Sequence, residues 1–297
     1  MANNLTGLIT AVITPFNSKE ELDEEGLIAN LTFQIRHHVS GIVLLGTTGE
    51  SPTILKQERR RMIEIARNVV PEQTSLWIGT GTASTHQTIE NCLEAEEGGA
   101  DGVLVVVPYY NRPTQEGLYR HFAAIAASIS IPICLYNVPK RTGQNLESAT
   151  VQRLSQLPSI IGIKDASGHL TQLEEMVATI RPDRPAFLFL SGDDSLALPF
   201  LTLGGDGLIS VASNLIPKTM KKLVESCLAG DVATGRSLHY QLLPLFKALS
   251  MEPNPIGIKA AMESAGMAAG PCRPPLCGPS SLHRELLDKQ VLLYASA

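Results

Sequence analysis

Eight short apolar runs recur along the chain, and helical spacing of apolar residues appears between them. The runs are rich in Val, Ile and Leu, which is typical of strands buried on both faces of a parallel sheet. They cover residues 7–16, 40–46, 75–81, 102–108, 132–138, 160–166, 187–193 and 207–213. The helical stretches include residues 53–70, 85–97, 115–129, 170–180 and 218–228.

This alternation predicts an α/β fold. Eight strand–helix units in the first 230 residues are what a (β/α)8 TIM barrel requires, with a C-terminal helical extension after it. The alternative is a doubly wound open sheet, which usually has fewer units and a Gly-rich fingerprint after its first strand; residues 11–17 (AVITPFN) carry none. We therefore expect residues 1–230 to form the barrel and residues 231–297 to extend the same domain.

Composition adds limits on partners and compartment. The 297 residues are 44% hydrophobic and 18% charged, with a net charge of −5, as in an ordinary globular protein. Lys and Arg are scattered without a basic stripe, so no nucleic-acid partner is expected. The N-terminus lacks the features of a secretory signal, and no apolar run is long enough to span a bilayer. We expect a cytoplasmic protein that has no membrane partner.

The cysteines agree with a reducing compartment. Five is an odd number, and Cys92, Cys134 and Cys227 lie in apolar or helical segments, which argues against a disulfide framework. The motif CRPPLC (residues 272–277) could supply half of a metal site. The seven histidines show no ligand spacing that would complete it, so no metal is expected.

The segment IIGIKDASG (residues 160–168) places a lysine at the end of an apolar strand. Side chains two apart share a face, so Ile160, Gly162 and Lys164 should lie on one side of the strand. Ile161 and Ile163 suit the strand–helix interface on the other side. Lys164 should therefore point inward at the C-terminal mouth of the barrel, and Gly162 below it should leave room for a ligand.

Burial of an amine has a chemical consequence. Dehydration disfavours the charged form of an ammonium and leaves a nucleophilic amine, which is what a Schiff-base lysine needs. Asp165 should point to the opposite face, so it is a poor candidate for neutralising Lys164. The alternative is a strand-end lysine that reaches solvent or pairs with a loop acid, and this strand alone leaves both possibilities open.

Other strand ends supply polar groups at the same mouth. LLGTTGES brings the hydroxyls of Thr47 and Thr48 together with glycines that let main-chain N–H groups approach an anion, although it could be only a capping turn. In PICLYNVPKRTG, Tyr136 should face the interior, and Arg141 follows in a loop where it could bind a carboxylate. A buried tyrosine is more often a core residue, and a lone loop arginine is usually solvated. VVPYYNRPTQEG places Tyr110 after the fourth strand, at the same end of the barrel.

The motifs GTTGES, YYNRPTQEG, YNVPKRTG, GIKDASG, SGDD and EPNPI resemble, in order and spacing, the dihydrodipicolinate synthase family of pyruvate-dependent class I aldolases. The resemblance covers essentially the whole chain. It implies condensation of pyruvate with L-aspartate 4-semialdehyde to 4-hydroxy-tetrahydrodipicolinate, in lysine and diaminopimelate biosynthesis. Because an iminium is itself an electron sink, no metal or organic cofactor is required.

The resemblance also implies residue roles. Lys164 would form the imine, and the proton relay would comprise Tyr136, Thr47 and, from a neighbouring subunit, Tyr110. Substrate contacts would come from four further positions: Thr48 for the pyruvate carboxylate, Arg141 for the semialdehyde carboxylate, and the main chains of Gly192 and Ile209. A homotetramer built as a dimer of dimers is expected.

Two rival functions stay open at this point. N-acetylneuraminate lyase and the 2-keto-3-deoxy sugar-acid aldolases share the scaffold and would keep Lys164 and Tyr136, but typically lack the pair of Tyr110 and Arg141, both present here. The other rival is a catalytically silent barrel kept as a binding protein. Such a chain should have lost some member of the relay, and none is lost.

One departure from the resemblance concerns regulation. In members that lysine inhibits, histidines after GTTGES, an asparagine after the third strand and a glutamate on the next helix hold the effector. The corresponding positions here are Lys56, Arg59, Ala83 and Gln87. Two added cations and one lost carboxylate oppose a ligand with two ammonium groups, so we expect insensitivity to L-lysine. The alternative, that these are only solvated helix residues, predicts the same result.

Overall fold

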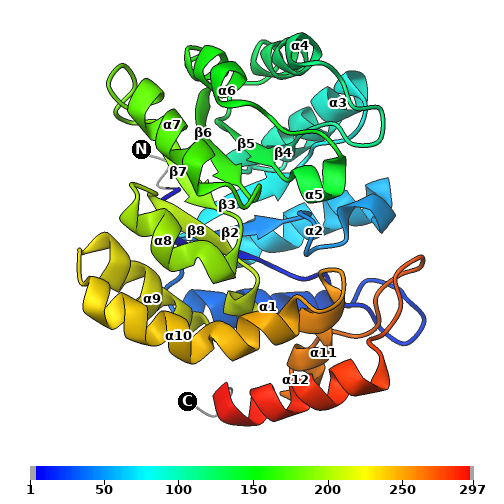
Figure 1. Cartoon of the computed structure of the whole chain (residues 1–297). Helices are drawn as coiled ribbons and strands as arrows, with labels where there is room; N and C mark the ends of the chain where they lie inside the picture. Colours follow the sequence, from blue (N-terminus) through cyan, green and yellow to red (C-terminus); the bar gives the residue numbers. More distant parts are fainter. Residues whose placement is uncertain (1–4, 295–297) are drawn as a thin grey trace.

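The computed structural model describes residues 5–294, and in that range eight parallel strands close into a barrel in sequential order. Figure 1 shows the strands at the centre with helices around them. The predicted (β/α)8 fold is confirmed. The strands are β1 Gly7–Ala11, β2 Gly41–Leu44, β3 Ser75–Gly79, β4 Gly102–Val106, β5 Ile133–Asn137, β6 Ile160–Asp165, β7 Leu188–Ser191 and β8 Gly207–Ser210.

Helices follow the strands and pack on the outside of the barrel. The helices of the barrel are α1 Glu24–Arg36, α2 Lys56–Val69, α3 Thr85–Glu97, α4 Gln115–Ala126, α5 Pro139–Thr142, α6 Ser148–Ser155, α7 Leu170–Ile180, α8 Ala197–Thr202 and α9 Pro217–Leu228. Three short 3₁₀ turns in the described chain are η1 Ser51–Thr53, η2 Asp194–Leu196 and η3 Ala212–Asn214. The predicted ranges 85–97 and 170–180 match α3 and α7.

Two apolar layers result from the alternation of side chains along the strands. One fills the barrel interior and includes Val43, Trp77, Leu104, Leu190 and Ile209. The other lies between the strands and the surrounding helices. Because the interior is filled in this way, the barrel has a packed core, and ligands can only be held at its ends.

Strand β6 departs from simple alternation at its start. Its register with β5 shifts between Ile160 and Gly162, which leaves Ile161 without a Cα partner. Ile160 consequently packs in the layer beneath the helices, and Ile161 packs against the interior cluster. The sides predicted for these two isoleucines are therefore wrong, because the irregularity adds one residue to β6 relative to β5. Ile163 lies in the helix-facing layer as predicted.

The C-terminal extension contains α10 Val232–Leu249, α11 Ile256–Ser264 and α12 Ser281–Tyr294. These helices lie along one side of the barrel, next to α1 and α9 (Figure 1). The Pro/Gly-rich residues 266–280 lie between α11 and α12. All five cysteines are free. No helix in the described range is both long and apolar enough to cross a membrane.

Lys259 of α11 ties the extension to the barrel. Its Nζ donates to the Glu50 carboxylate at 2.8 Å, and to the main-chain oxygens of Thr14 at 3.0 Å and Pro271 at 2.6 Å. Both charged side chains of this ion pair are buried. Burial lowers the pKa of Lys259, and the Glu50 carboxylate opposes that shift. Nothing in the local sequence around Lys259 indicates that this second lysine is buried.

Candidate active site

Lys164 and Tyr136 face each other on adjacent strands at the barrel mouth. They are register partners in β6 and β5, and the Lys164 Nζ lies 4.2 Å from the centroid of the Tyr136 ring. Both side chains are 6% exposed. Within the described chain, Lys164 forms no ion pair with a carboxylate. The amine therefore sits in a largely dehydrated place beside a phenol, which is the environment that a nucleophilic lysine needs.

Asp165 lies on the other side of β6. Its carboxylate accepts hydrogen bonds from the Asn137 side chain at 2.9 Å and from the Ser167 hydroxyl at 2.7 Å. Burial raises the pKa of Asp165, and these two hydrogen bonds counteract part of that effect. Asp165 thus belongs to a polar cluster outside the barrel interior.

The glycine that makes room for the lysine is Gly192, whereas Gly162 has another role. A Cβ at Gly192 would lie 2.9 Å from the Lys164 Cε, so only a glycine lets the lysine side chain pass there. A Cβ at Gly162 would lie 2.6 Å from the main-chain oxygen of Leu188. The expectation that Gly162 leaves room for a ligand is wrong, because strand β7 occupies that space.

Thr47 and Thr48 lie in the turn after β2. Thr47 is half-buried, and Thr48 is 2% exposed. The Thr48 Oγ1 accepts a hydrogen bond from the Asn254 Nδ2 at 2.9 Å. Among the hydrogen bonds of residues 5–294, the main-chain N–H groups of Thr47 and Thr48 donate to no protein acceptor. Two free N–H groups and two hydroxyls in one turn form a suitable cradle for a carboxylate.

Arg141 and Tyr110 lie further out. Arg141 is on the short helix α5; it is exposed, and one Nη2–H donates to the main-chain oxygen of Asn254 at 3.3 Å. Tyr110 follows β4, has a φ of 71° and is 94% exposed. A left-handed backbone at a tyrosine is uncommon and often marks a functional loop. The phenol of Tyr110 therefore faces solvent rather than the interior of its own barrel.

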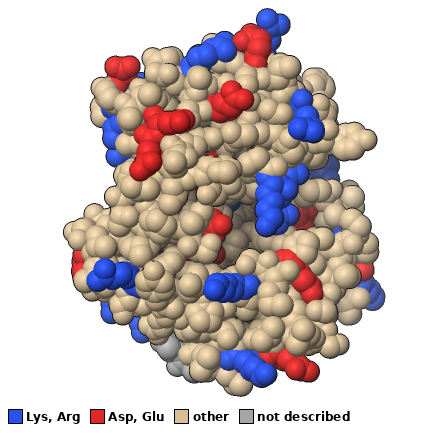
Figure 2. All heavy atoms as spheres, in the orientation of Figure 1, with Lys and Arg blue, Asp and Glu red and all other residues tan. Residues whose placement is uncertain are grey.

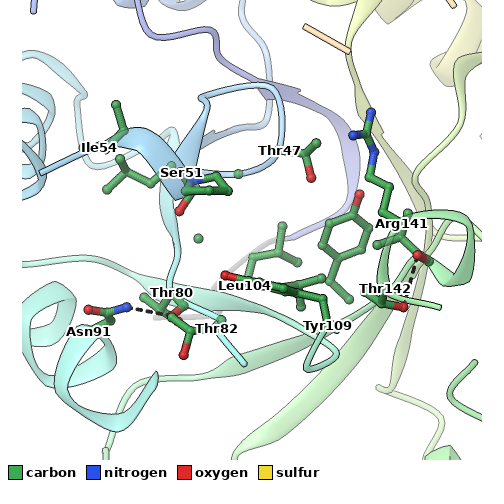
Figure 3. A pocket seen from close by; sticks show the side chains of 18 of the residues that line it. Thr47, Ser51, Ile54, Thr80, Thr82, Asn91, Leu104, Tyr109, Arg141 and Thr142 are labelled. Atoms are coloured by element: carbon green, nitrogen blue, oxygen red, sulfur yellow. Dashed lines mark hydrogen bonds between the residues drawn. The ribbon is translucent and has the colours of Figure 1, made fainter. Parts of the chain in front are cut away.

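These residues surround two adjoining cavities. A cavity of about 610 Å³ is lined by Lys164, Thr48, Gly192 and Asn254 among others. A neighbouring cavity of about 860 Å³ is lined by Thr47, Tyr109 and Tyr110 among others. Tyr136, Val138, Lys140 and Arg141 line both cavities. Figure 3 shows the larger one, with Thr47 and Arg141 to one side and Thr80, Thr82 and Asn91 across from them.

Ile209 lies deeper than its predicted role suggests. It belongs to the packed interior of the barrel, and it is not among the residues that line either cavity. Val211, two residues further along the chain, lines the smaller cavity instead. Seven of the eight predicted site residues therefore line these two cavities, and Ile209 supports them from below.

The smaller cavity is lined by both basic and acidic side chains. Lys140, Arg141 and Lys164 line it together with Asp193, Asp194 and Glu252. A hollow in the middle of the face drawn in Figure 2 has basic and acidic side chains at its rim. Burial raises the pKa of Asp194 to about 6, although its carboxylate accepts main-chain hydrogen bonds from Val211 and Ala212. In the described part of the chain, no group of three or more His, Cys, Asp or Glu side chains could hold a metal ion.

The four positions that correspond to the L-lysine effector site of inhibited members lie near the larger cavity. Three of them, Lys56, Arg59 and Gln87, line it. Arg59 is not a solvated helix residue: it is 7% exposed, and its Nη1–H donates to the main-chain oxygen of Gly79 at 3.1 Å. Burial lowers the pKa of Arg59, and Glu94 opposes that shift. Ala83 does not line the cavity; its main-chain oxygen accepts from the Asn111 side chain.

Two residues of the smaller cavity, Asn254 and Asp194, were given no role from the sequence. Asn254 belongs to EPNPI and Asp194 to SGDD, which are two of the motifs that carry the family resemblance. The presence of those motifs was the only signal for them. Nothing in the local pattern of either segment shows that it reaches the cavity.

The sequence matches one family of enzymes along almost its whole length. The model of the dihydrodipicolinate synthetase family matches residues 4–292. A 4-hydroxy-tetrahydrodipicolinate synthase of Protochlamydia amoebophila is 50% identical over 283 residues, covering 95% of this chain and 94% of the relative.

Solved structures give the same result. The crystal structure of dihydrodipicolinate synthase from Thermotoga maritima superposes with a TM-score of 0.95 at 39% identity, covering 98% of each chain. A structure of the Cyanidioschyzon merolae enzyme with lysine bound has a TM-score of 0.94 at 34% identity, again covering 98% of each chain. The chain therefore belongs to the dihydrodipicolinate synthetase family of enzymes.

Proposed function

We propose that this enzyme condenses pyruvate with L-aspartate 4-semialdehyde to give 4-hydroxy-tetrahydrodipicolinate, a step in the biosynthesis of lysine and diaminopimelate. The observation that carries the proposal is the buried, carboxylate-free amine of Lys164 against the Tyr136 ring. The 4-hydroxy-tetrahydrodipicolinate synthases among its relatives support this choice of substrates.

The reaction begins at Lys164. Its amine attacks the keto carbon of pyruvate, and loss of water gives an imine. The imine draws electrons from the adjacent methyl group, which loses a proton to become an enamine. The enamine carbon then attacks the aldehyde carbon of the second substrate. The amino group of that substrate attacks the imine carbon, which closes the ring and releases Lys164.

Each step after the first attack needs protons to move. Tyr136 would give and take them, and the position of its ring against the Lys164 Nζ supports this role. Thr47 and the partner subunit's copy of Tyr110 would carry protons onward to solvent. The carboxylate of pyruvate would lie in the cradle of Thr48 and its neighbouring N–H groups, and that of the semialdehyde against Arg141.

A coupled assay tests the proposal. Purified enzyme is mixed with pyruvate, the semialdehyde and dipicolinate reductase, and loss of NADPH is followed by absorbance. The expected result is turnover that requires both substrates and that Lys164→Ala abolishes. Turnover of N-acetylneuraminate without use of the semialdehyde would instead make the enzyme one of the sister aldolases.

We also propose a homotetramer working in the cytoplasm. The 94% exposed Tyr110 supports an assembly, because a relay phenol that faces solvent in one chain needs a second chain to become useful. Five free cysteines agree with a reducing compartment. Sedimentation or light scattering of the purified enzyme gives the oligomeric state directly.

A further inference from the structure

The C-terminal extension contributes a side chain to the cavity that holds Lys164. The loop between α10 and α11 brings Asn254 to its wall. The Asn254 Nδ2 donates to the Thr48 Oγ1 at 2.9 Å, and the Asn254 main-chain oxygen accepts from the Arg141 guanidinium at 3.3 Å. One residue thus contacts both groups proposed to bind substrate carboxylates.

The hydrogen bond from Asn254 determines whether the Thr48 hydroxyl can donate or accept a hydrogen bond in the cavity. A hydroxyl has one proton to donate and lone pairs with which to accept. Because Asn254 donates to the Oγ1, the Thr48 proton must go elsewhere, and it meets no protein acceptor among residues 5–294. Thr48 is 2% exposed, so bulk water is not freely available to it. The remaining direction is the cavity.

We propose that Asn254 is a positioning residue that fixes the Thr48 hydroxyl as a hydrogen-bond donor to the pyruvate carboxylate. This inference rests on the proposed function. An anion is bound by hydrogen-bond donors. A threonine hydroxyl that donates its proton to another acceptor would present only lone pairs to the anion. The amide of Asn254 is therefore suited to this position because it can donate, and a carboxylate of the same size could not.

Two further observations agree with this role. The Asn254 Oδ1 is buried and accepts no hydrogen bond from the described residues, so the donating half of the amide is the half in use. The loop is also held in place, because Lys259, on the helix that begins two residues after Asn254, is anchored to Glu50. Glu50 in turn lies two residues after Thr48 in the same turn of the chain.

The test measures pyruvate binding by borohydride trapping. Intact full-length enzyme is titrated with pyruvate, reduced, and analysed by mass spectrometry to obtain the pyruvate concentration for half-maximal labelling of Lys164. Asn254→Ala should raise this concentration about tenfold, as expected for one lost hydrogen bond. Asn254→Asp should raise it by about a hundredfold, because the carboxylate accepts the Thr48 proton and also repels pyruvate.

Controls separate positioning from general damage. In a Thr48→Val background, Asn254→Ala should have no further effect on pyruvate binding, because there is no hydroxyl left to orient. Asn30 makes a comparable contact between barrel and extension, donating from its side chain to the Ala268 main-chain oxygen at 2.8 Å, and it lines neither cavity. Asn30→Ala should leave pyruvate binding within about twofold of wild type.

The outcomes distinguish this inference from the proposed function. Absence of labelling in the wild type would contradict the proposed function itself. Wild-type labelling combined with unchanged binding by Asn254→Asp would overturn the inference, since Thr48 would then be giving its proton to residue 254. The inference would also be overturned if Asn254→Ala weakened pyruvate binding as much in the Thr48→Val background as it does in the wild type. If Asn254→Ala does not fold, the isosteric Asn254→Asp carries the test.

Discussion

The Asp194 carboxylate shows how one residue can connect the site to stability. It lies against the 3₁₀ turn η3, where its Oδ2 accepts from the main-chain N–H groups of Val211 and Ala212, and its Oδ1 is buried. Burial penalises the charged form more than these hydrogen bonds favour it, and the pKa of Asp194 rises from 3.8 to about 6. The folded state therefore holds a proton that the unfolded state releases at a lower pH.

The sign of the resulting pH dependence follows from linkage. Between pH 4 and 6 the folded chain binds more protons at this position than the unfolded chain, so the contribution of Asp194 to stability is present below pH 4 and is lost as the pH rises through 6. An asparagine side chain cannot titrate, so Asp194→Asn should gain on the order of 2 kcal/mol in unfolding free energy between pH 4 and pH 7, relative to wild type. Denaturant unfolding at both pH values measures this. The same change in unfolding free energy between pH 4 and pH 7 in wild type and in Asp194→Asn would refute this prediction.

At the residue scale, the sequence predicts those positions that alternation alone determines. Lys164, Tyr136 and Ile163 are on the predicted sides because they lie in the regular parts of β5 and β6. Asn254 could not be predicted in the same way, because it meets Thr48 across 206 residues of chain. Contacts of that kind depend on how the extension packs, which no local pattern encodes.

At the element scale, the tie between α11 and the turn after β2 is the contact with the clearest energetic consequence. Lys259 and Glu50 form an ion pair that is almost fully removed from solvent, and the ammonium also donates to two main-chain oxygens. A buried pair of this kind contributes little net stability over an apolar pair, but the loss of one partner leaves an uncompensated buried charge. Substitution of either partner alone should therefore be costly.

We expect Lys259→Met to lower the free energy of unfolding by about 3–5 kcal/mol. The matched control is Lys221→Met on α9, because Lys221 pairs with Glu225 one turn along the same helix and both side chains are partly exposed. That change should cost less than about 1 kcal/mol. Urea unfolding followed by circular dichroism measures both. Similar losses of unfolding free energy in the two variants would mean that Lys259→Met does not leave the Glu50 carboxylate as an uncompensated buried charge.

The elements that the sequence predicted well have a strong period and a clear cap. Helix α3 begins after Ser84, whose side chain accepts from the Gln87 main chain, and its range matches the predicted one. Helix α5 has four residues and α8 has six, which is too short to show a helical period, and neither was predicted. The irregularity in β6 was missed because a strand of isoleucines fits either side of the sheet.

At the scale of the whole molecule, the exposed phenol of Tyr110 predicts that the site is completed by a second chain. We expect Tyr110→Phe and Lys164→Ala to be inactive alone and to regain up to about a quarter of wild-type activity when mixed, because half of randomly exchanged dimers then contain one intact site of two.

The control for this experiment uses two residues of one chain. Tyr136 and Lys164 are in contact within the same barrel, so mixing Tyr136→Phe with Lys164→Ala cannot assemble an intact site. The relay does not cross between chains if activity also recovers in this control mixture. The same conclusion follows if the mixture of Tyr110→Phe and Lys164→Ala regains no activity although the subunits are shown to exchange.

The surface around the larger cavity predicts that L-lysine does not inhibit this enzyme. Lys56 and the buried Arg59 line it, and Gln87 stands where a carboxylate would be needed to pair with an ammonium group. Loss of two charge-assisted hydrogen bonds weakens binding by roughly a hundredfold or more. The coupled assay at subsaturating pyruvate, with L-lysine up to about 1 mM, should show unchanged rates. Partial inhibition below that concentration would mean that the cavity accepts lysine despite its cations.

The most direct test of the proposed chemistry is covalent trapping of pyruvate. Incubation of the enzyme with pyruvate and borohydride should add one reduced pyruvyl group per chain, and peptide mapping should place it on Lys164. Lys259, which is also buried but is paired with Glu50, serves as an internal control and should stay unlabelled. Labelling of Lys259 or another lysine, or no labelling at all, would contradict the assignment of Lys164 as the amine that binds pyruvate.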